Sequence, residues 1–258
     1  MLTLLLTAAL ALPLPAQEDG PKPPDPKVVK ETVQKLKSAI KQRDPLVHVQ
    51  TISDATSVLD GEVIKYIGKG LNDNEPTVRM AAAEALRYMN HPTALKTLES
   101  KIKRDRKVHK DAEYYSTLLK AMAQHGKESS IEILKDKAFA NTESSIVTAR
   151  IYGLGHIRSK ESIEAIFSLM SSSGRKKASP YMSQFRISLI MLTGVDKGKT
   201  QAPWFAWWND NKKTFELPKT PPLMPKQMQN RWDRFWGYDY KRERPKKRGD
   251  RGNDPEKS

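Results

Sequence analysis

The sequence predicts an all-α protein, built as a right-handed α-solenoid of about four to five helix pairs with a tryptophan-rich C-terminal cap. Three observations support this prediction. An apolar triplet with helical spacing recurs along the chain, an acid–proline pair recurs between triplets, and strand signals are almost absent. Because alternation of apolar and polar residues never runs past four residues, a sheet is not expected.

The apolar triplet marks the first helix of each predicted pair. Its members stand at i, i+3 and i+7, so they share one face of a helix. Successive copies begin 31, 31, 36 and 32 residues apart, which is the spacing of stacked helix pairs. The five copies are Val33/Leu36/Ile40, Ile64/Ile67/Leu71, Leu95/Leu98/Ile102, Ile131/Leu134/Ala138 and Ile163/Ile166/Met170.

An acidic residue followed by proline marks the start of the second helix. Asp44-Pro45 and Glu75-Pro76 again stand 31 residues apart. Proline disfavours a helical conformation in the residue before it and suits the first turn of the helix that follows. The second helices also share a small residue, which allows two helices to approach closely. The small residues are Ala85, Ala121 and Gly153.

Residues 75–86 read EPTVRMAAAEAL and are followed by ALKTL at 94–98. This combination resembles the HEAT-repeat family, particularly its short bacterial form, and the resemblance extends over residues 27–195. It implies an α-solenoid with a concave surface for a protein or other macromolecular partner, and it implies no cofactor. The family also includes lyases that act on bilins and a branch of DNA glycosylases, so the fold alone does not assign a function.

The N-terminal residues 1–17 are apolar and uncharged, and the run is too short to span a bilayer. We interpret them as a signal peptide cleaved near Ala16 or Gln17, followed by a flexible linker at 18–26. The alternative is an apolar helix packed on the domain. The signal peptide predicts export to the periplasm or the medium. Since the chain has no cysteine, disulfides, thiolate chemistry and Cys-bound metals are excluded.

Residues 196–217 form the predicted cap. Trp204, Trp207 and Trp208 have helical spacing, and Phe215 follows. Together with Leu192-Thr193-Gly194 and Asn211, they resemble a terminal module of exported bacterial HEAT-like proteins. We favour a cap that seals the open end of the solenoid. The alternative is an aromatic platform for sugars or bases.

Residues 218–258 read as a proline-rich linker and a basic, largely disordered tail. Within them, Trp232, Phe235 and Trp236 can form one short amphipathic turn. We expect this turn to fold back on the solenoid or to dock into a partner. The tail proper, from Arg242 to Arg251, is rich in arginine and lysine.

The sequence carries no strong sign of catalysis, and we predict that the protein is not an enzyme. Gly198-Lys199-Thr200 is similar to a phosphate-binding loop, but only three residues separate Gly194 from Gly198 where such a loop has four. We expect a helix that ends at Gly194, followed by a charged loop. The five histidines lack metal-ligand spacing, so no metal site is predicted. We interpret His91, His125 and His156 as polar residues at turns between helices.

The net charge of +15 favours acidic partners. The leading hypothesis is a non-catalytic scaffold that binds a protein outside the cytoplasm, through the side of the solenoid formed by the second helices. The alternative is a binder of nucleic acid or another polyanion through basic ridges and the tail. The oligomeric state is left open. The candidate partner-binding residues are Lys65, Lys69, Lys96, Lys103, Lys135, Trp232, Trp236, Arg242 and Arg244.

Overall fold

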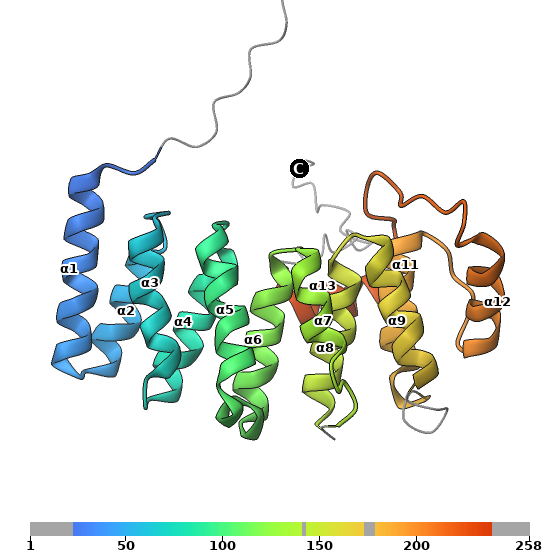
Figure 1. Cartoon of the computed structure of the whole chain (residues 1–258), viewed down its shortest axis with the longest axis horizontal. Coiled ribbons are helices and arrows are strands. Elements are labelled where there is room, and N and C mark those ends of the chain that lie inside the picture. Colours follow the sequence, from blue (N-terminus) through green and yellow to red (C-terminus); the bar gives the residue numbers. More distant parts are fainter. Residues whose placement is uncertain (1–22, 141–142, 173–178, 239–258) are drawn as a thin grey trace, which may run out of the picture.

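The computed structural model describes residues 23–140, 143–172 and 179–238. This part of the chain consists of α-helices and short 3-10 helices, and no strand occurs in it (Figure 1). The predicted all-α class is therefore confirmed. No helix among these residues is long and apolar enough to cross a membrane. The predicted signal peptide, most of the linker that follows it, and Arg242 and Arg244 lie outside the described residues.

The helices form consecutive pairs. The first three pairs comprise α1 (Pro26–Gln42) with α2 (Pro45–Ala55), α3 (Gly61–Lys69) with α4 (Pro76–Tyr88), and α5 (Pro92–Arg104) with α6 (Ala112–Gln124). The next two comprise α7 (Ile131–Lys135) with α8 (Ser144–His156), and α9 (Lys160–Ser172) with α11 (Met182–Thr193). Short 3-10 helices lie at η1 (Gly70–Asn72), η2 (Arg106–Lys110), η3 (Glu128–Ser130) and η4 (Ser179–Tyr181).

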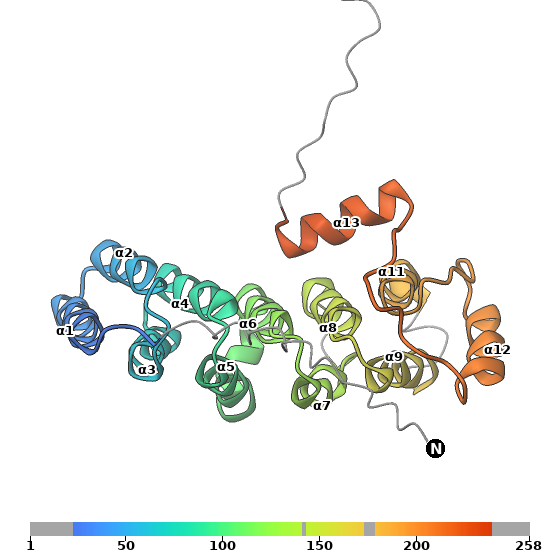
Figure 2. The ribbon, with the colours of Figure 1, turned by 90° about the horizontal axis from the view of Figure 1, so that it is seen from above.

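The pairs are arranged side by side in two layers (Figure 2). The A layer contains α1, α3, α5, α7 and α9, and the B layer contains α2, α4, α6, α8 and α11. Each B-layer helix packs on the next along the row, and each also packs on the A-layer helix of its own pair. The molecule is therefore an elongated row in which a pair mainly contacts the pairs next to it.

Two B-layer helices, α2 and α4, begin as the acid–proline pattern predicts. The carboxylate of Asp44 accepts hydrogen bonds from the backbone N–H groups of Leu46 (2.9 Å) and Val47 (3.3 Å), and Pro45 is the first helical residue. Such caps satisfy N–H groups that have no partner within the helix. Asp111 caps α6 in the same way. Glu75 precedes Pro76 but makes no capping bond through its side chain.

The apolar triplets form the core between the layers. Thirteen of the fifteen triplet residues are buried, and the other two, Ile40 and Leu95, are half-buried. The small position is also confirmed at Gly153, where an added Cβ would lie 3.0 Å from side-chain atoms of both Ala123 and Leu134. One element differs from expectation. The helix α7 ends at Lys135, because Asp136 is extended and Lys137 has a φ of 47°, so the buried Ala138 lies in a turn.

The helix α12 (Gln201–Asn211) lies at the far end of the row, beyond α9 and α11 (Figure 1). Trp204 and Trp208 are buried, and Trp208 stacks on Phe167 of α9 with a centroid distance of 5.5 Å. Neither of these rings is free to stack on a ligand. The helix α11 ends with Gly194 in a left-handed conformation (φ 73°), as expected.

The last described helix, α13 (Lys226–Trp236), lies in the C-terminal segment, where the sequence predicts one short amphipathic turn. The segment contains an 11-residue helix rather than one short turn. It forms because Trp232 and Trp236, one helical turn apart, both become buried against the rest of the protein. The helix lies across the B layer, on the side away from the A layer (Figure 2).

Candidate functional site

The surface beneath α13 brings together residues from four B-layer helices. On α11, Ser183 Oγ accepts a hydrogen bond from Arg231 Nη1 at 2.8 Å. Rings of α8 contact the middle of α13, and side chains of α6 and α4 contact its C-terminal end. We call this surface the α13 groove and define it by six residues, namely Arg87, Lys120, Gln124, Tyr152, His156 and Ser183.

Aromatic anchors hold α13 in the groove. Trp232 is 2% exposed and Trp236 is completely buried. The Trp232 ring meets Tyr152 edge-on at 5.5 Å, and the Trp236 ring lies 4.4 Å from the ring of His156. Phe235 meets Tyr152 edge-on at 4.9 Å. Large rings of this kind contribute most of the binding free energy in helix-in-groove contacts, and each pair adds roughly 0.5–1.5 kcal/mol beyond its buried area.

Arg87 of α4 closes the C-terminal end of α13. Its Nη2 donates to the backbone carbonyl of Trp236, and both Nε and Nη2 donate to Gln124 Oε1 at 3.3 and 3.0 Å. Nη1 donates to Glu84 Oε1 at 2.7 Å. The last carbonyls of a helix carry partial negative charge, so a guanidinium at this position stabilises the helix end. The Arg87 side chain is only 1% exposed.

His156, the last residue of α8, is part of the groove and not simply a polar turn residue. Burial, with a smaller effect from the charge of Arg87, lowers its pKa to about 4. The imidazole is therefore neutral at neutral pH, which suits a ring that stacks on Trp232 at 6.3 Å and lies tilted against Trp236. Its Nε2 lies 3.4 Å from Gln124 Nε2, so the groove has a continuous polar edge from Arg87 through Gln124 to His156.

Two buried polar atoms of α13 lack a hydrogen-bond partner in the described part of the chain. They are the indole nitrogen of Trp236 and the side-chain oxygen of Asn230. A buried polar group without a partner costs roughly 1–3 kcal/mol. The helix α13 therefore fits the groove well in shape but incompletely in hydrogen bonding.

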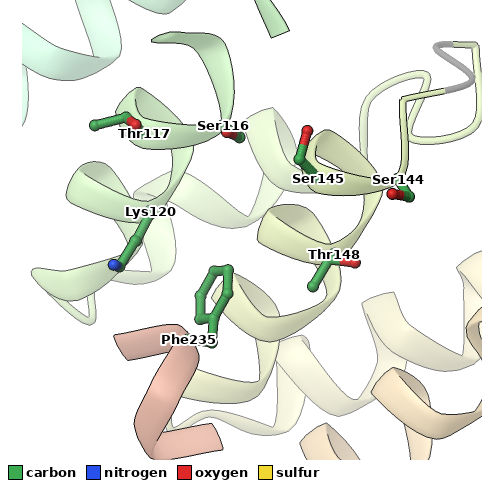
Figure 3. Close-up of a pocket in the computed structure, with 7 residues that line it drawn as sticks. All are labelled: Ser116, Thr117, Lys120, Ser144, Ser145, Thr148 and Phe235. Atoms are coloured by element: carbon green, nitrogen blue, oxygen red, sulfur yellow. The ribbon is translucent and has the colours of Figure 1, made fainter. Parts of the chain in front are cut away.

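An open pocket of about 350 Å³ lies beside α13, between α6 and α8 (Figure 3). Phe235 of α13 borders this pocket, and the ammonium of Lys120 on α6 is 5.5 Å from the centroid of its ring. Burial, followed by repulsion from Arg87, lowers the pKa of Lys120. No salt bridge to Lys120 occurs among the described residues. The other residues lining the pocket carry hydroxyls, and they are Ser116, Thr117, Ser144, Ser145 and Thr148.

The predicted lysines do not lie on the B layer, which corrects the expectation for them. Lys65 and Lys69 belong to α3, Lys96 and Lys103 to α5, and Lys135 to α7, all in the A layer. These lysines are interleaved with the apolar triplets, and the triplets mark the A-layer helices. The sequence prediction therefore places these partner-binding lysines on the second helix of each pair, whereas they lie on the first.

Of the predicted residues within the described part of the chain, Trp232 and Trp236 reach the groove. Sequence reasoning missed Arg87, Tyr152 and His156. Arg87 offered one signal, because it is a charged residue next to Leu86 on a helix otherwise rich in alanine. A charged side chain at such a position must be paired if it is buried.

Comparison of the chain with models of protein families gives no match, and a search of curated proteins gives no similar sequence. The resemblance to HEAT repeats therefore rests on the repeated residues themselves.

Proposed function

We propose that this protein is a non-catalytic scaffold, a right-handed α-solenoid of HEAT type that binds a protein partner through its B layer. The arrangement of five consecutive helix pairs in two layers supports the solenoid. The binding role rests on one observation, the seating of α13 on the B layer with Trp232 and Trp236 buried. A surface that accepts a helix through aromatic anchors has the chemistry of a helix-in-groove binding site.

Capture of a partner from extracts of the source cells tests this function. The bait is the full-length chain, and the B-layer variant is Tyr88→Glu with Thr117→Glu. The matched A-layer control is Tyr66→Glu with Ser100→Glu, which places the same charges on α3 and α5. We expect the bound protein, identified by mass spectrometry, to be lost with the B-layer variant and retained with the control. Equal retention by both variants would refute binding through the B layer.

We also propose that the scaffold works outside the cytoplasm, on the basis of the apolar, uncharged residues 1–17. N-terminal sequencing of the native protein tests this proposal. The expected mature chain begins at or near Gln17, and a native chain that begins at Met1 would contradict export.

A second candidate function, polyanion binding, is favoured by the segment Lys101–Lys110 at the end of α5 and in η2. Its single acidic residue, Asp105, is paired with Lys101 at 2.7 Å, and this hydrogen bond is the main reason that the pKa of Asp105 is lowered. The other lysines and arginines there are exposed and form no salt bridge among the described residues, and they are Lys103, Arg104, Arg106, Lys107 and Lys110. If this function holds, affinity for DNA or heparin falls steeply with salt, because phosphate contacts release counterions. A flat salt dependence, or no binding, would remove this candidate.

A further inference from the structure

We propose that the α13 groove is the binding site for an acidic amphipathic helix of a protein partner, and that α13 is a resident occupant which this helix displaces. The proposal rests on the scaffold function and specifies the partner for it. The partner helix carries large aromatic residues at i and i+4, with a third apolar residue at i+3, and acidic residues on its flanks.

The spacing of the anchors comes from α13 itself. Trp232, Phe235 and Trp236 stand at i, i+3 and i+4, and each meets a B-layer ring or cation. A helix that enters from another protein must present its anchors with the same spacing, because the rings of Tyr152 and His156 are fixed on α8. Its C-terminal carbonyls would lie at Arg87, as the Trp236 carbonyl does.

The acidic character of the partner follows from charge. The helix α13 carries Lys226, Arg231 and Arg234 against one acid, Asp233. Two more cations, Lys120 and Arg87, lie beneath its C-terminal end, so basic residues outnumber acidic ones in this contact. Lys120 forms no salt bridge within the described residues. The nearest carboxylate that acts on its charge is that of Glu84, which is already hydrogen-bonded to Arg87. A helix with carboxylates near its i+3 anchor would give Lys120 a partner.

Three features make α13 displaceable. Trp236 and Asn230 each have a buried polar atom without a hydrogen-bond partner among the described residues, and the cost of burying these atoms weakens the docking of α13. The backbone of α13 also stands farther from the B layer than the B-layer helices stand from one another, so side chains alone bridge the contact (Figure 2). Finally, the segment before α13, residues 217–225, is proline-rich and includes the fully exposed Leu223, so α13 can leave without disturbing a helix pair.

Peptide binding to an emptied groove tests the proposal. The host is the full-length chain with Trp232→Ala and Trp236→Ala, and a second host carries Asn230→Pro, which breaks α13 by another route. Circular dichroism establishes that both hosts keep their helix pairs. The probes are fluorescent peptides of residues 224–238, one with the native sequence and one with Arg231→Glu and Arg234→Glu. These changes move the net charge of the peptide from +2 to −2. A peptide with both tryptophans replaced by alanine is the control.

We expect the acidic peptide to bind both hosts at least about fivefold more tightly than the native peptide at low salt, which corresponds to roughly 1 kcal/mol. Replacing Lys120 with Gln in the host should reduce that preference. The wild-type chain should bind the acidic peptide at least about tenfold more weakly than the hosts do, because α13 occupies its groove. The alanine peptide should not bind.

Three results would overturn the proposal. The first is that neither host binds either aromatic peptide. The second is that the wild-type chain and the hosts bind the acidic peptide with equal affinity. The third is that the hosts bind the native peptide more tightly than the acidic one, which would indicate exchange of α13 between copies of this chain. Failure of the scaffold function is distinguishable. If the acidic peptide binds but extracts yield no partner that depends on the B layer, the specificity of the groove stands and the scaffold function fails.

Discussion

The guanidinium of Arg87 serves acceptors on three separate parts of the chain, although its side chain is almost completely buried. It reaches the carbonyl of Trp236, the amide oxygen of Gln124 and the carboxylate of Glu84, and it lies 4.7 Å from the centroid of the Tyr88 ring. A buried guanidinium is tolerated only when its donors are used in this way. Arg87 is therefore the residue at which the row of helix pairs and α13 are most directly joined.

Replacement of Arg87 with Met should weaken the docking of α13. Methionine keeps much of the apolar volume but leaves the Trp236 carbonyl and Gln124 without their donor, which costs about 2–3 kcal/mol. Hydrogen exchange of residues 226–236 measures the effect and should accelerate by one to two orders of magnitude. The control is Lys135→Met, which removes a surface ion pair with Glu132 and should change stability by less than about 0.5 kcal/mol. Unchanged exchange in α13 would show that Arg87 does not hold it.

The close approach of α8 and α11 depends on Gly155. An added Cβ on Gly155 of α8 would lie 2.8 Å from the backbone Cα of Ser188 on α11, closer than such atoms pack. Replacement of Gly155 with Ala should therefore destabilise the protein by about 1–3 kcal/mol, measured by urea unfolding. Gly61→Ala is the matched control, because its Cβ would make only ordinary contacts at 3.6 Å. A Gly155→Ala protein as stable as the control would contradict the close contact of α8 with α11.

At the scale of the element, α13 should respond to pH through His156. The docked pKa of about 4 lies below the ordinary value of 6.5, so protonation favours the state in which α13 is released. The contribution is fully present above about pH 6.5 and is lost progressively toward pH 4. Between pH 7.5 and pH 5 the loss is at most on the order of 2 kcal/mol, because part of the burial of His156 remains when α13 is released. Hydrogen exchange of α13 as a function of pH, corrected for intrinsic rates, measures it.

The control for this pH dependence is His156→Gln, which keeps a polar group without an ionisable ring. It should flatten the dependence of α13 while leaving any effect of His125, whose pKa is also lowered, mainly by burial on α6. A wild-type α13 that docks equally well at pH 7.5 and pH 5 would rule out His156 as the cause.

Elements with a local signal could be predicted from the sequence, and those without one could not. The A-layer helices follow from triplets such as Ile64, Ile67 and Leu71, because burial of one helical face repeats with each pair. The start of α2 follows from Asp44 and Pro45. The groove did not follow, because its contacts join residues far apart in sequence, as Arg87 and Trp236 are. Local sequence periodicity gives no information on such long-range contacts. From the sequence, α13 is therefore predicted only as one short amphipathic turn in a disordered tail.

At the scale of the whole molecule, the row has two unlike ends. The C-terminal end is covered by α12, whose Trp204 and Trp208 are buried, whereas Val28 at the beginning of α1 is 43% exposed. Because each pair mainly contacts its neighbours, the stability of a row depends on such end contacts.

Replacement of Trp208 with Ala should uncover the end at α9. The loss of the ring that stacks on Phe167 should cost about 3–5 kcal/mol, measured by denaturant unfolding. Hydrogen exchange should accelerate in α9, α11 and α12 more than in α3 and α4, because α3 and α4 belong to a pair that is not next to this end of the row. Tyr88→Ala, at a ring that is 59% exposed, is the control and should have little effect. Uniform acceleration along the row would contradict a local role for the cap.

The tether between α12 and α13 has a quantitative consequence for any competitor. Fourteen residues, Lys212–Pro225, connect the two helices, and a short tether holds its ligand at an effective concentration in the millimolar range. A free helix with contacts no better than those of α13 would need a comparable concentration to fill half of the sites. The groove is therefore closed to weak helices at low concentration. A helix that binds only several-fold more tightly than α13 fills it when the helix is abundant or gains avidity from a second contact. Shortening the tether would raise that threshold as long as the tether still spans the distance between the two helices, and lengthening it would lower the threshold, without any change in the groove itself.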